Sequence, residues 1–341
     1  MTGELTVSRR RFLGGISAVA GAAALPSLIR AAALGRSGSV APSQRVTLGV
    51  VSMGSGVLAP SVREFQRHAD AQIIAHGPAD ELAARPEIDA LLIVAAGRCG
   101  VAPDIARAAA TKDIFCAAPE NLTISEGRGL ANAMAAGNRI FQAAYAGRSL
   151  AVYRQLIGSI RNGRIGRLQK IAIAAPDGVW AARLIDVAQW ANGTETLGPV
   201  EIRNGAAPGL GIEYRYAKGV VMELRRGRPA IRVEGTAGWI ASDGWGGRLQ
   251  AGAASLLDLP PTTDALVCPG GPYRNFLDCV KSRLSCAVPA EVAHRTATIA
   301  NLGGMAVRLR RMLQWNPYAE NFIGDAQADA LRGNRASVWI A

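Results

Sequence analysis

The first half of the chain alternates short apolar runs with stretches whose apolar residues recur at helical spacing. Strands are predicted where aliphatic residues cluster between turn residues, and helices where the period lengthens to three or four residues. The predicted strands are Val46–Val51, Ala71–Ala75, Ile88–Ala95, Asp113–Cys116 and Arg139–Ala144, and the predicted helices are Pro60–His68, Asp80–Ala84, Pro103–Thr111 and Ser125–Ala136. This alternation predicts an α/β sheet of parallel strands.

The second half has a different order of elements. Ala151–Arg161 is predicted to be a helix with one apolar face, and Asn162-Gly163 ends it. Successive strands with Gly- or Pro-containing turns are predicted next. They are Val200–Arg203, Gly211–Tyr216, Gly219–Arg225, Ala230–Gly235 and Gly238–Ala241. A long helix at Ala293–Leu313 follows, with Ile299, Leu302, Ala306, Leu309 and Leu313 on one face. A chain of 341 residues is long enough for two such domains.

The N-terminus has the pattern of an export signal. The segment Ser8-Arg9-Arg10-Arg11-Phe12-Leu13 precedes an uncharged run of small residues from Gly14 to Leu25. Paired arginines before Phe-Leu indicate the twin-arginine route, and the run is too short for a good membrane span. We expect a signal peptide at 1–36, a linker at 37–44 and a periplasmic or secreted protein without a membrane span after processing. An uncleaved anchor is the alternative.

Composition and charge argue against nucleic-acid binding. The formal net charge is +12, and the first 36 residues hold five arginines and one glutamate, so the remainder carries +8. Its basic residues are spread along the chain and form no long basic run. The five cysteines form no Cys-x-x-Cys, so neither a zinc site nor a thioredoxin-type motif is indicated. Cys279 and Cys286 could pair in an oxidising periplasm, but we favour buried free thiols.

The turn after the first strand departs from a dinucleotide-binding fingerprint. Where Gly-x-Gly-x-x-Gly would place its three glycines, the chain has Ser52, Gly54 and Val57. A βα turn that holds no nucleotide is a serious alternative. The second strand should end in an acid that holds a ribose, but it ends in His76-Gly77. His76 is either a ribose contact or, as we favour, a surface residue.

The order of elements resembles the glucose–fructose oxidoreductase, inositol dehydrogenase and rhizopine-catabolism family (Gfo/Idh/MocA), in its exported bacterial branch. The stretches that carry the resemblance are the leader, the first βα turn, Lys112–Gly127, Arg161–Ile171, Ile185–Trp190, Tyr273–Arg283, Ala293–Arg311, Gln314–Pro317 and Phe322–Asp325. The resemblance implies a trimmed Rossmann-like parallel sheet at 45–148 and an α+β domain at 149–341 with a large, mostly antiparallel sheet. It also implies NAD(P), a sugar or cyclitol substrate, and a homo-oligomer formed through the C-terminal sheet. The cofactor would lie against Ser52, Met53, Gly54, Ala95 and Pro119.

The first catalytic motif of this family is altered. The family places Glu-Lys-Pro after the strand that ends here at Cys116, and the corresponding residues are Ala117, Ala118 and Pro119. An alanine methyl cannot donate a hydrogen bond to a substrate oxygen or stabilise an alkoxide.

The second motif, Asp-x-Gly-x-His-x-x-Asp, corresponds to Val179, Ala181, Arg183 and Asp186. Arginine stays protonated and cannot act as a general base. Asp186 is a candidate base, but we favour an ion pair with Arg183 three residues before it. His294 corresponds to a histidine in relatives, and a capping or packing role is favoured over catalysis.

Two main functions remain open. One is an exported oxidoreductase with tightly held NAD(P) that acts on a sugar or cyclitol. The other is a binding or assembly protein in which the cofactor site and catalysis are lost. We favour the second because the phosphate turn, the ribose acid and the Lys/His pair are all altered. A redox-neutral lyase or hydrolase that uses the remodelled cleft is a third, smaller possibility.

Overall fold

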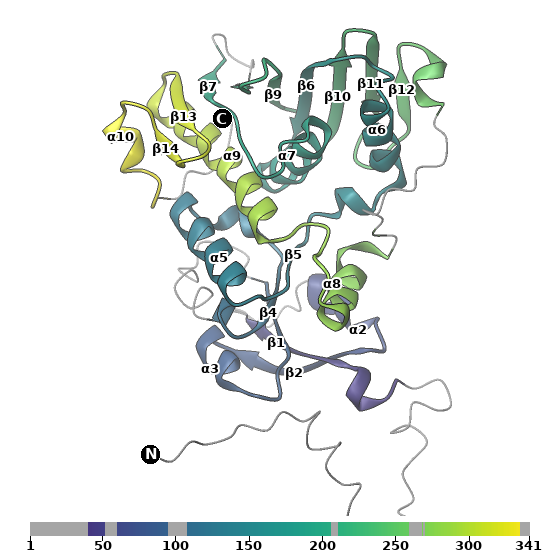
Figure 1. The fold of residues 1–341 in the computed structure, drawn as a ribbon, viewed down its shortest axis with the longest axis vertical. Helices are drawn as coiled ribbons and strands as arrows, with labels where there is room; N and C mark the ends of the chain where they lie inside the picture. Colours follow the sequence, from purple (N-terminus) through teal and green to yellow (C-terminus); the bar gives the residue numbers. More distant parts are fainter. Residues whose placement is uncertain are drawn as a thin grey trace, which may run out of the picture. The chain divides into compact units, whose positions relative to one another are not determined.

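The computed structural model describes residues 40–51, 60–94, 108–205, 211–258, 268 and 270–334 (Figure 1). The predicted signal peptide, the turn with Ser52, Met53, Gly54 and Val57, and the residues Ala95 and Cys99 lie outside the described residues. Within the predicted linker, Pro42–Gln44 form the short 3₁₀ helix η2. Residues 45–341 form one unit by their contacts.

The N-terminal half forms a sheet of five parallel strands in the order β2-β1-β3-β4-β5. The strands are β1 (Val46–Val51), β2 (Ala71–Gly77), β3 (Ala90–Ile93), β4 (Asp113–Cys116) and β5 (Phe141–Ala143). Every residue of β3, β4 and β5 is buried, as expected for parallel strands covered on both faces. The predicted Rossmann-like sheet is therefore confirmed, and only the six-residue helix α3 (Ala79–Ala84) joins β2 to β3.

Apolar clusters lie on both sides of this sheet. On one side, α3 and α5 (Ile124–Ala136) pack through Leu82, Leu130 and Met134. On the other side lie α2 (Pro60–Gln66) and α8 (Gly271–Ser282). There Phe65, Phe115, Tyr273 and Phe276 contact one another edge to face or stacked. A helix from the C-terminal half of the sequence thus completes the core of the N-terminal sheet.

The second sheet has nine strands in the order β12-β11-β10-β6-β9-β8-β7-β13-β14. All of its neighbouring pairs are antiparallel except β6 with β9, which confirms the mostly antiparallel sheet. The strands are β6 (Leu168–Ala175), β7 (Glu201–Asn204), β8 (Ile212–Arg215), β9 (Val221–Arg226), β10 (Ala230–Gly235), β11 (Gly238–Ser242), β12 (Leu249–Ala251), β13 (Leu313–Asn316) and β14 (Asn321–Phe322).

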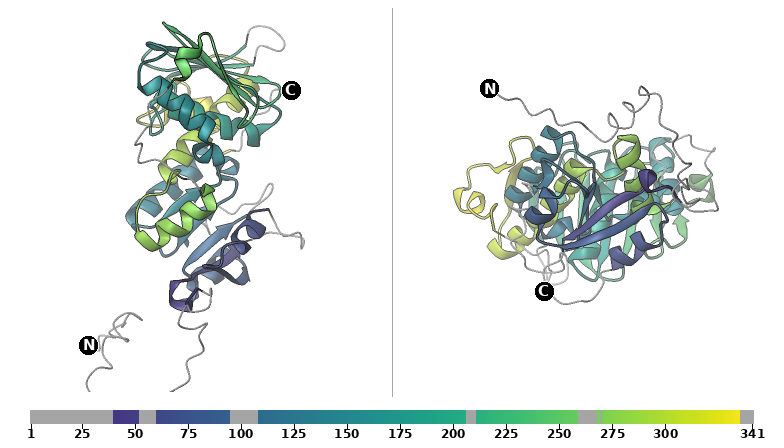
Figure 2. Two further views of the ribbon diagram at one scale, coloured as in Figure 1. Left: turned by 90° about the vertical axis from the view of Figure 1, so that its right-hand side faces the viewer. Right: turned by 90° about the horizontal axis from the view of Figure 1, so that it is seen from below.

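Helices cover one face of this sheet and leave the other open (Figure 2). The covering helices include α7 (Gly178–Asn192) and α9 (Ala290–Leu309), with α6 (Ala151–Arg161) beside α7. Further helices within the described residues are η3 (Pro119–Asn121), η4 (Ala146–Ser149), η5 (Ala254–Leu257) and α10 (Ala326–Asp329). Alternate residues of the strands point to the two faces of the sheet. Ile171, Ile173 and Val233 are buried on the covered face, while Lys170 and Glu223 form a half-exposed ion pair on the other.

The end of α9 differs from the prediction. The helix ends at Leu309, and Arg310 follows with a φ of 52°, in the left-handed region that commonly ends helices. Leu313 is therefore the first residue of β13 and not part of the helix. Its apolar side chain is buried in either arrangement, so the spacing of apolar residues could not show the break.

Candidate functional site

The loop after β4 lies at the carboxyl edge of the parallel sheet, where ligands of α/β folds bind. The backbone N–H of Ala117 donates to the carbonyl of Ile93, and η3 begins directly after Ala118. Ala117 and Ala118 are half-buried and Pro119 is buried. The position at which the resembled family carries lysine therefore presents a methyl group.

Glu120 and Tyr145 meet beside this loop. Glu120 follows β4 and Tyr145 follows the neighbouring strand β5, so both lie at the same edge of the sheet. The Tyr145 hydroxyl donates to Glu120 Oε2 over 3.2 Å. Sequence reasoning missed both residues, since neither corresponds to a family motif position. A signal was present, because an acidic residue directly follows the only retained residue of the first motif.

The pKa of the Glu120 carboxyl group is raised toward neutral pH. Burial raises its pKa to about 7, and the Tyr145 hydroxyl and the Arg183 guanidinium limit the rise, while Asp177 adds to it. Burial also raises the pKa of Tyr145 well above its ordinary value, so this phenol stays protonated. The pair consists of a titrating carboxyl group and a neutral hydroxyl group, which can both hydrogen-bond to the hydroxyls of a ligand.

We expect the substitution Glu120→Gln to change how stability depends on pH. Because the folded-state pKa of Glu120 lies above the ordinary 4.5, its contribution is fully present below that value and is lost as pH rises through about 7. The variant should therefore match wild type near pH 4 and exceed it by about 1–3 kcal/mol near pH 8. Urea unfolding at both pH values measures this, and a difference that does not vary with pH would contradict the assignment.

Arg183 lies on α7, and its side chain is half-buried rather than packed in the apolar core. Its guanidinium stacks over the Trp180 ring at 4.9 Å from the centroid, and its charge acts on Glu120. The other altered positions of the second motif contribute no chemistry, since Val179 is exposed and Ala181 is buried in the core. Arg183 is thus a fixed positive charge near the Glu120 carboxyl group.

Asp186 does not pair with Arg183, so that expectation was wrong. Its two oxygens accept from Arg148 Nη2 at 2.8 Å and Arg148 Nε at 3.2 Å, and Asp186 has no exposed surface. On α7 the Asp186 side chain faces the interior, whereas the Arg183 side chain extends over Trp180. Arg148 lies on η4 (Ala146–Ser149), the short helix that follows Tyr145. Asp186 therefore acts as the buried counter-ion of Arg148, with both oxygens occupied.

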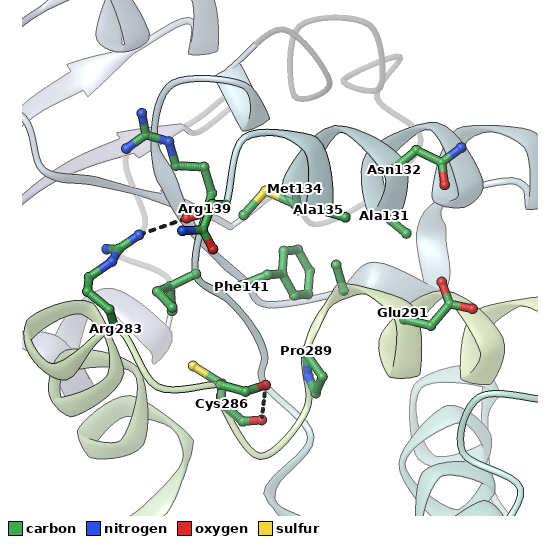
Figure 3. Close-up of a pocket in the computed structure, with 14 residues that line it drawn as sticks. Ala131, Asn132, Met134, Ala135, Arg139, Phe141, Arg283, Cys286, Pro289 and Glu291 are labelled. Atoms are coloured by element: carbon green, nitrogen blue, oxygen red, sulfur yellow. Dashed lines mark hydrogen bonds between the residues drawn. The ribbon is translucent and has the colours of Figure 1, made fainter.

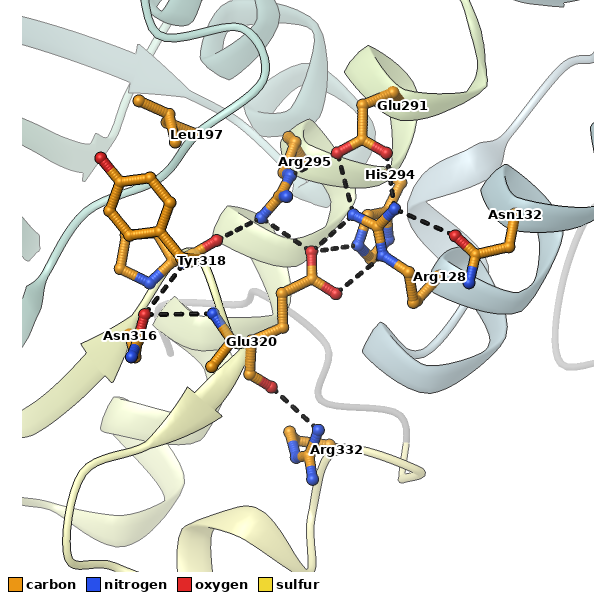
Figure 4. Close-up of polar contacts among 12 residues, drawn as sticks. Arg128, Asn132, Leu197, Glu291, His294, Arg295, Asn316, Tyr318, Glu320 and Arg332 are labelled. Carbon is orange, nitrogen blue, oxygen red and sulfur yellow. Dashed lines mark hydrogen bonds and ion pairs between the residues drawn. The ribbon is translucent and has the colours of Figure 1, made fainter. Parts of the chain in front are cut away.

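His294 lies in a buried network of charged side chains (Figure 4). Its Nε2 is 2.8 Å from Glu320 Oε1, and the same carboxylate accepts from Arg128 and is ion-paired with Arg295. Burial lowers the pKa of His294, which favours the neutral ring with Nε2–H donating to Glu320. The ring packs against Gly127, where a Cβ would lie 2.6 Å from Nδ1. The His294 ring is thus held in the interior by Glu320 and by close packing on Gly127.

The structure brings His294 and Pro119 to the same small cavity. It has a volume of about 10 Å³, close to the space of one water molecule, and Leu130 and Phe141 also line it. Two of the residues singled out from the sequence therefore lie close together, while Asp186 is enclosed by Arg148 elsewhere in the core.

The described residues retain one feature of a nicotinamide cofactor site and lack another. At the end of β2, His76 is exposed, and Glu81 Oε2 lies 3.9 Å from where a Cβ on Gly77 would be. A carboxylate from α3 thus stands where the strand itself lacks an acid. On the catalytic side, the Ala118 side chain offers no polar atom to a reacting hydroxyl. The residues do not fit hydride transfer as the family performs it.

The described residues meet the requirements of neither a metal site nor a membrane-spanning helix. Among those residues, no group of three or more His, Cys, Asp or Glu side chains could hold a metal ion. No helix in the same part of the chain is both long enough and apolar enough to cross a membrane.

The fold is that of sugar and cyclitol dehydrogenases. Similar solved structures include aldose-aldose oxidoreductase from Caulobacter crescentus complexed with glycerol (TM-score 0.58, 12% identity, 79% of this chain and 99% of that chain). Scyllo-inositol dehydrogenase from Lactobacillus casei with bound NAD(H) and scyllo-inositol is also similar (TM-score 0.55, 15%, 79% and 99%). So is GenD2 from gentamicin A biosynthesis in complex with NAD (TM-score 0.61, 13%, 80% and 97%).

A match to a family agrees with this fold. Residues 205–338 match the Gfo/Idh/MocA family described as "Oxidoreductase family, C-terminal alpha/beta domain". Comparison with curated proteins found no match. The solved structures share little sequence with this chain, so their likeness establishes the architecture, and the chemistry of the site must be argued from its own residues.

Proposed function

We propose that this chain is an exported protein of the sugar-oxidoreductase fold that binds a sugar or cyclitol without oxidising it. One observation carries the proposal: the loop after β4 presents Ala118 where hydride-transfer chemistry needs a cation, next to the Glu120–Tyr145 pair. A lysine ammonium would stabilise the negative charge that develops on the substrate oxygen, whereas a methyl group cannot.

The side chains around Glu120 suit recognition of a polyol. A carboxylate accepts hydrogen bonds from sugar hydroxyls, and the neutral Tyr145 phenol can donate and accept. Arg183 adds a fixed donor close to Glu120 but cannot take up a proton. The groups that remain therefore favour binding over removal of a hydride and a proton.

Export is part of the proposal and is supported by the leader sequence. Arg9, Arg10 and Arg11 precede Phe12-Leu13 and the small-residue run, as in twin-arginine signals. Free nicotinamide cofactor is scarce outside the cytoplasm, so an exported protein with a weakened cofactor site would work without NAD(P).

We also propose that the open face of the nine-stranded sheet is a surface for self-association, as the family resemblance implies. This face carries ion pairs such as Lys170–Glu223 and Arg232–Glu234, and Arg232 stacks over Trp239 at 3.8 Å. Charges that are already paired within the sheet cost less to bring against a second copy than isolated charges would.

An active periplasmic oxidoreductase with tightly held NAD(P) is the second candidate. The observation that favours it is the Glu81 carboxylate beside Gly77, which could hold a ribose in place of the missing strand-end acid. In that case Glu120, with a pKa of about 7, would be the residue available to accept the hydroxyl proton.

The double variant Ala118→Lys with Arg183→His tests the proposal. Wild type and the double variant are mixed with NAD⁺ or NADP⁺ and a panel of sugars and cyclitols, and reduced cofactor is followed by its absorbance. We expect no reduction by either protein, because the phosphate turn is also altered. Ala117→Lys is the matched control for a lysine one position away, and a known inositol dehydrogenase confirms the assay. Clear turnover by wild type or the double variant would overturn the proposal.

A further inference from the structure

Two cysteines lie next to one another where α8 ends. Cys279 is in the last turns of α8, and Cys286 follows the reversal of the chain at Arg283, whose φ of 63° is left-handed. Both side chains are buried in the same apolar cluster. Both are free thiols in this structure.

Asn275 holds the two backbone segments together. Its Oδ1 accepts from the N–H of Ala287, directly after Cys286, over 2.9 Å, and its Nδ2 lies 3.6 Å from Cys279 Sγ. Hydrogen bonding between the two thiols lowers the pKa of Cys279 and raises that of Cys286. Loss of the first proton is easier for the pair than for a single buried thiol, because the remaining S–H donates a hydrogen bond to the thiolate.

A solvent-accessible cavity reaches one of the two sulfur-bearing residues. The cavity has a volume of about 340 Å³ between α5 and the connection from α8 to α9. Figure 3 shows Cys286 on its wall, between Arg283 and Pro289. Cys279 does not line the cavity. An oxidant can thus approach Cys286, with Cys279 behind it.

Cys268 is a neighbouring thiol with other partners. Its Sγ donates to the carbonyl of Gly271 over 3.2 Å and accepts from the Ser149 hydroxyl over 3.4 Å. The hydrogen bonds of Cys268 are thus made to Gly271 and Ser149, whereas Asn275 links the segments that carry Cys279 and Cys286.

We propose that Cys279 and Cys286 form a disulfide when the protein reaches an oxidising compartment. The structure then represents the reduced form in which the chain folds before export. This modification is independent of what the site near Glu120 binds.

The reaction proceeds by thiol–disulfide exchange. Cys279 loses its proton more readily than Cys286. Transfer of the Cys286 proton to the Cys279 thiolate lets the Cys286 sulfur, which lines the cavity, attack an oxidised dithiol carrier or oxidised glutathione, which releases one thiol and leaves a mixed disulfide on Cys286. Cys279 then attacks Cys286 Sγ, which forms the protein disulfide and releases the second thiol. Two thiols of the protein are oxidised, one disulfide of the carrier is reduced, and the protons pass to the released thiols.

Peptide mapping of the full-length protein tests the proposal. The folded protein is treated with oxidised glutathione, then unfolded in denaturant that contains iodoacetamide, so that free thiols are alkylated, and digested with trypsin. Trypsin cuts after Lys281 and Arg283 and so separates the two cysteines. We expect one disulfide joining the Cys279 and Cys286 peptides, with Cys116 and Cys268 alkylated. Reduction should lower the melting temperature by about 5 °C. Alkylation of both Cys279 and Cys286, or a disulfide to Cys268, would overturn the proposal.

Single variants test the order of attack. Cys279→Ser should leave Cys286 carrying glutathione as a stable mixed disulfide, and Cys286→Ser should leave Cys279 unmodified in the folded protein. A glutathione adduct on Cys279 but not on Cys286 would contradict the cavity route. Mapping of wild type decides the proposal even if a variant fails to fold.

Discussion

Replacing Asp186 by Ala is expected to reduce the free energy of unfolding by about 3–5 kcal/mol. The substitution leaves the Arg148 guanidinium buried, with only 5% of its side chain exposed, and without a close counter-ion. Glu195, at 3.9 Å from Arg148 Nη1, is too far to replace the paired hydrogen bonds of Asp186. Because domains are stable by only about 5–15 kcal/mol, this loss should be visible in urea unfolding.

The double variant Arg148→Met with Asp186→Leu is the matched comparison. Removing both charges leaves no unpaired ion in the core, so we expect the double variant to recover much of the stability that the single variant loses. Glu64→Ala, which breaks the exposed Arg67–Glu64 pair, should change stability by less than about 1 kcal/mol. If Asp186→Ala cost no more than Glu64→Ala, the buried pair would not be a structural anchor, and Asp186 would return as a candidate base.

Replacing Glu320 by Gln should cost about 3 kcal/mol. Glu320 is the acceptor shared by Arg128, Arg295 and His294, at 2.7, 2.7 and 2.8 Å. Gln keeps the shape of the side chain but loses the charge that balances two arginines. Glu291→Gln is the matched control, because Glu291 binds the same arginines from a half-exposed position. We expect it to cost about 1 kcal/mol in thermal or urea unfolding.

The effect of Glu320→Gln should shrink in acid. Although burial opposes ionisation, His294 and Arg128 hold the pKa of Glu320 far below its ordinary 4.5. A carboxyl group with a lowered folded-state pKa contributes stability above about 4.5 and loses it as pH falls toward the folded value. Wild type and variant should therefore differ fully near pH 7 and by less near pH 3, where part of the contribution has been lost. An equal difference at both pH values would contradict the role of the Glu320 charge.

Elements set by local patterns were predictable from the sequence. The bounds of α6 and β4 agree with the predicted Ala151–Arg161 and Asp113–Cys116, since periodicity and the following turn residues determine both. The start of α5 also follows local chemistry, because Thr123 and Glu126 form a capping box. The end of α9 was not predictable, since a single left-handed arginine ends a run that keeps helical spacing.

The polar contacts of the site depend on residues far apart in the sequence, and these were missed. Glu120 meets Tyr145 because β4 and β5 are neighbours, and Asp186 meets Arg148 because η4 packs against α7. A helix-surface rule placed Arg183 three residues from Asp186, but such a rule ignores which side chain faces the core. Motif positions predicted a site at the loop after β4, while the contacts of Glu120, Tyr145 and Arg183 beside this loop had to be seen in the fold.

The central claim is that this protein no longer works with a nicotinamide cofactor, and its bound nucleotide tests this most directly. The purified protein is denatured, the precipitate is removed, and the absorbance and mass of the supernatant are measured against protein concentration. Because the turn at Ser52–Val57 keeps one of three fingerprint glycines, we predict no NAD(P). One NAD(P) per chain in that supernatant would contradict the account and favour an active periplasmic oxidoreductase.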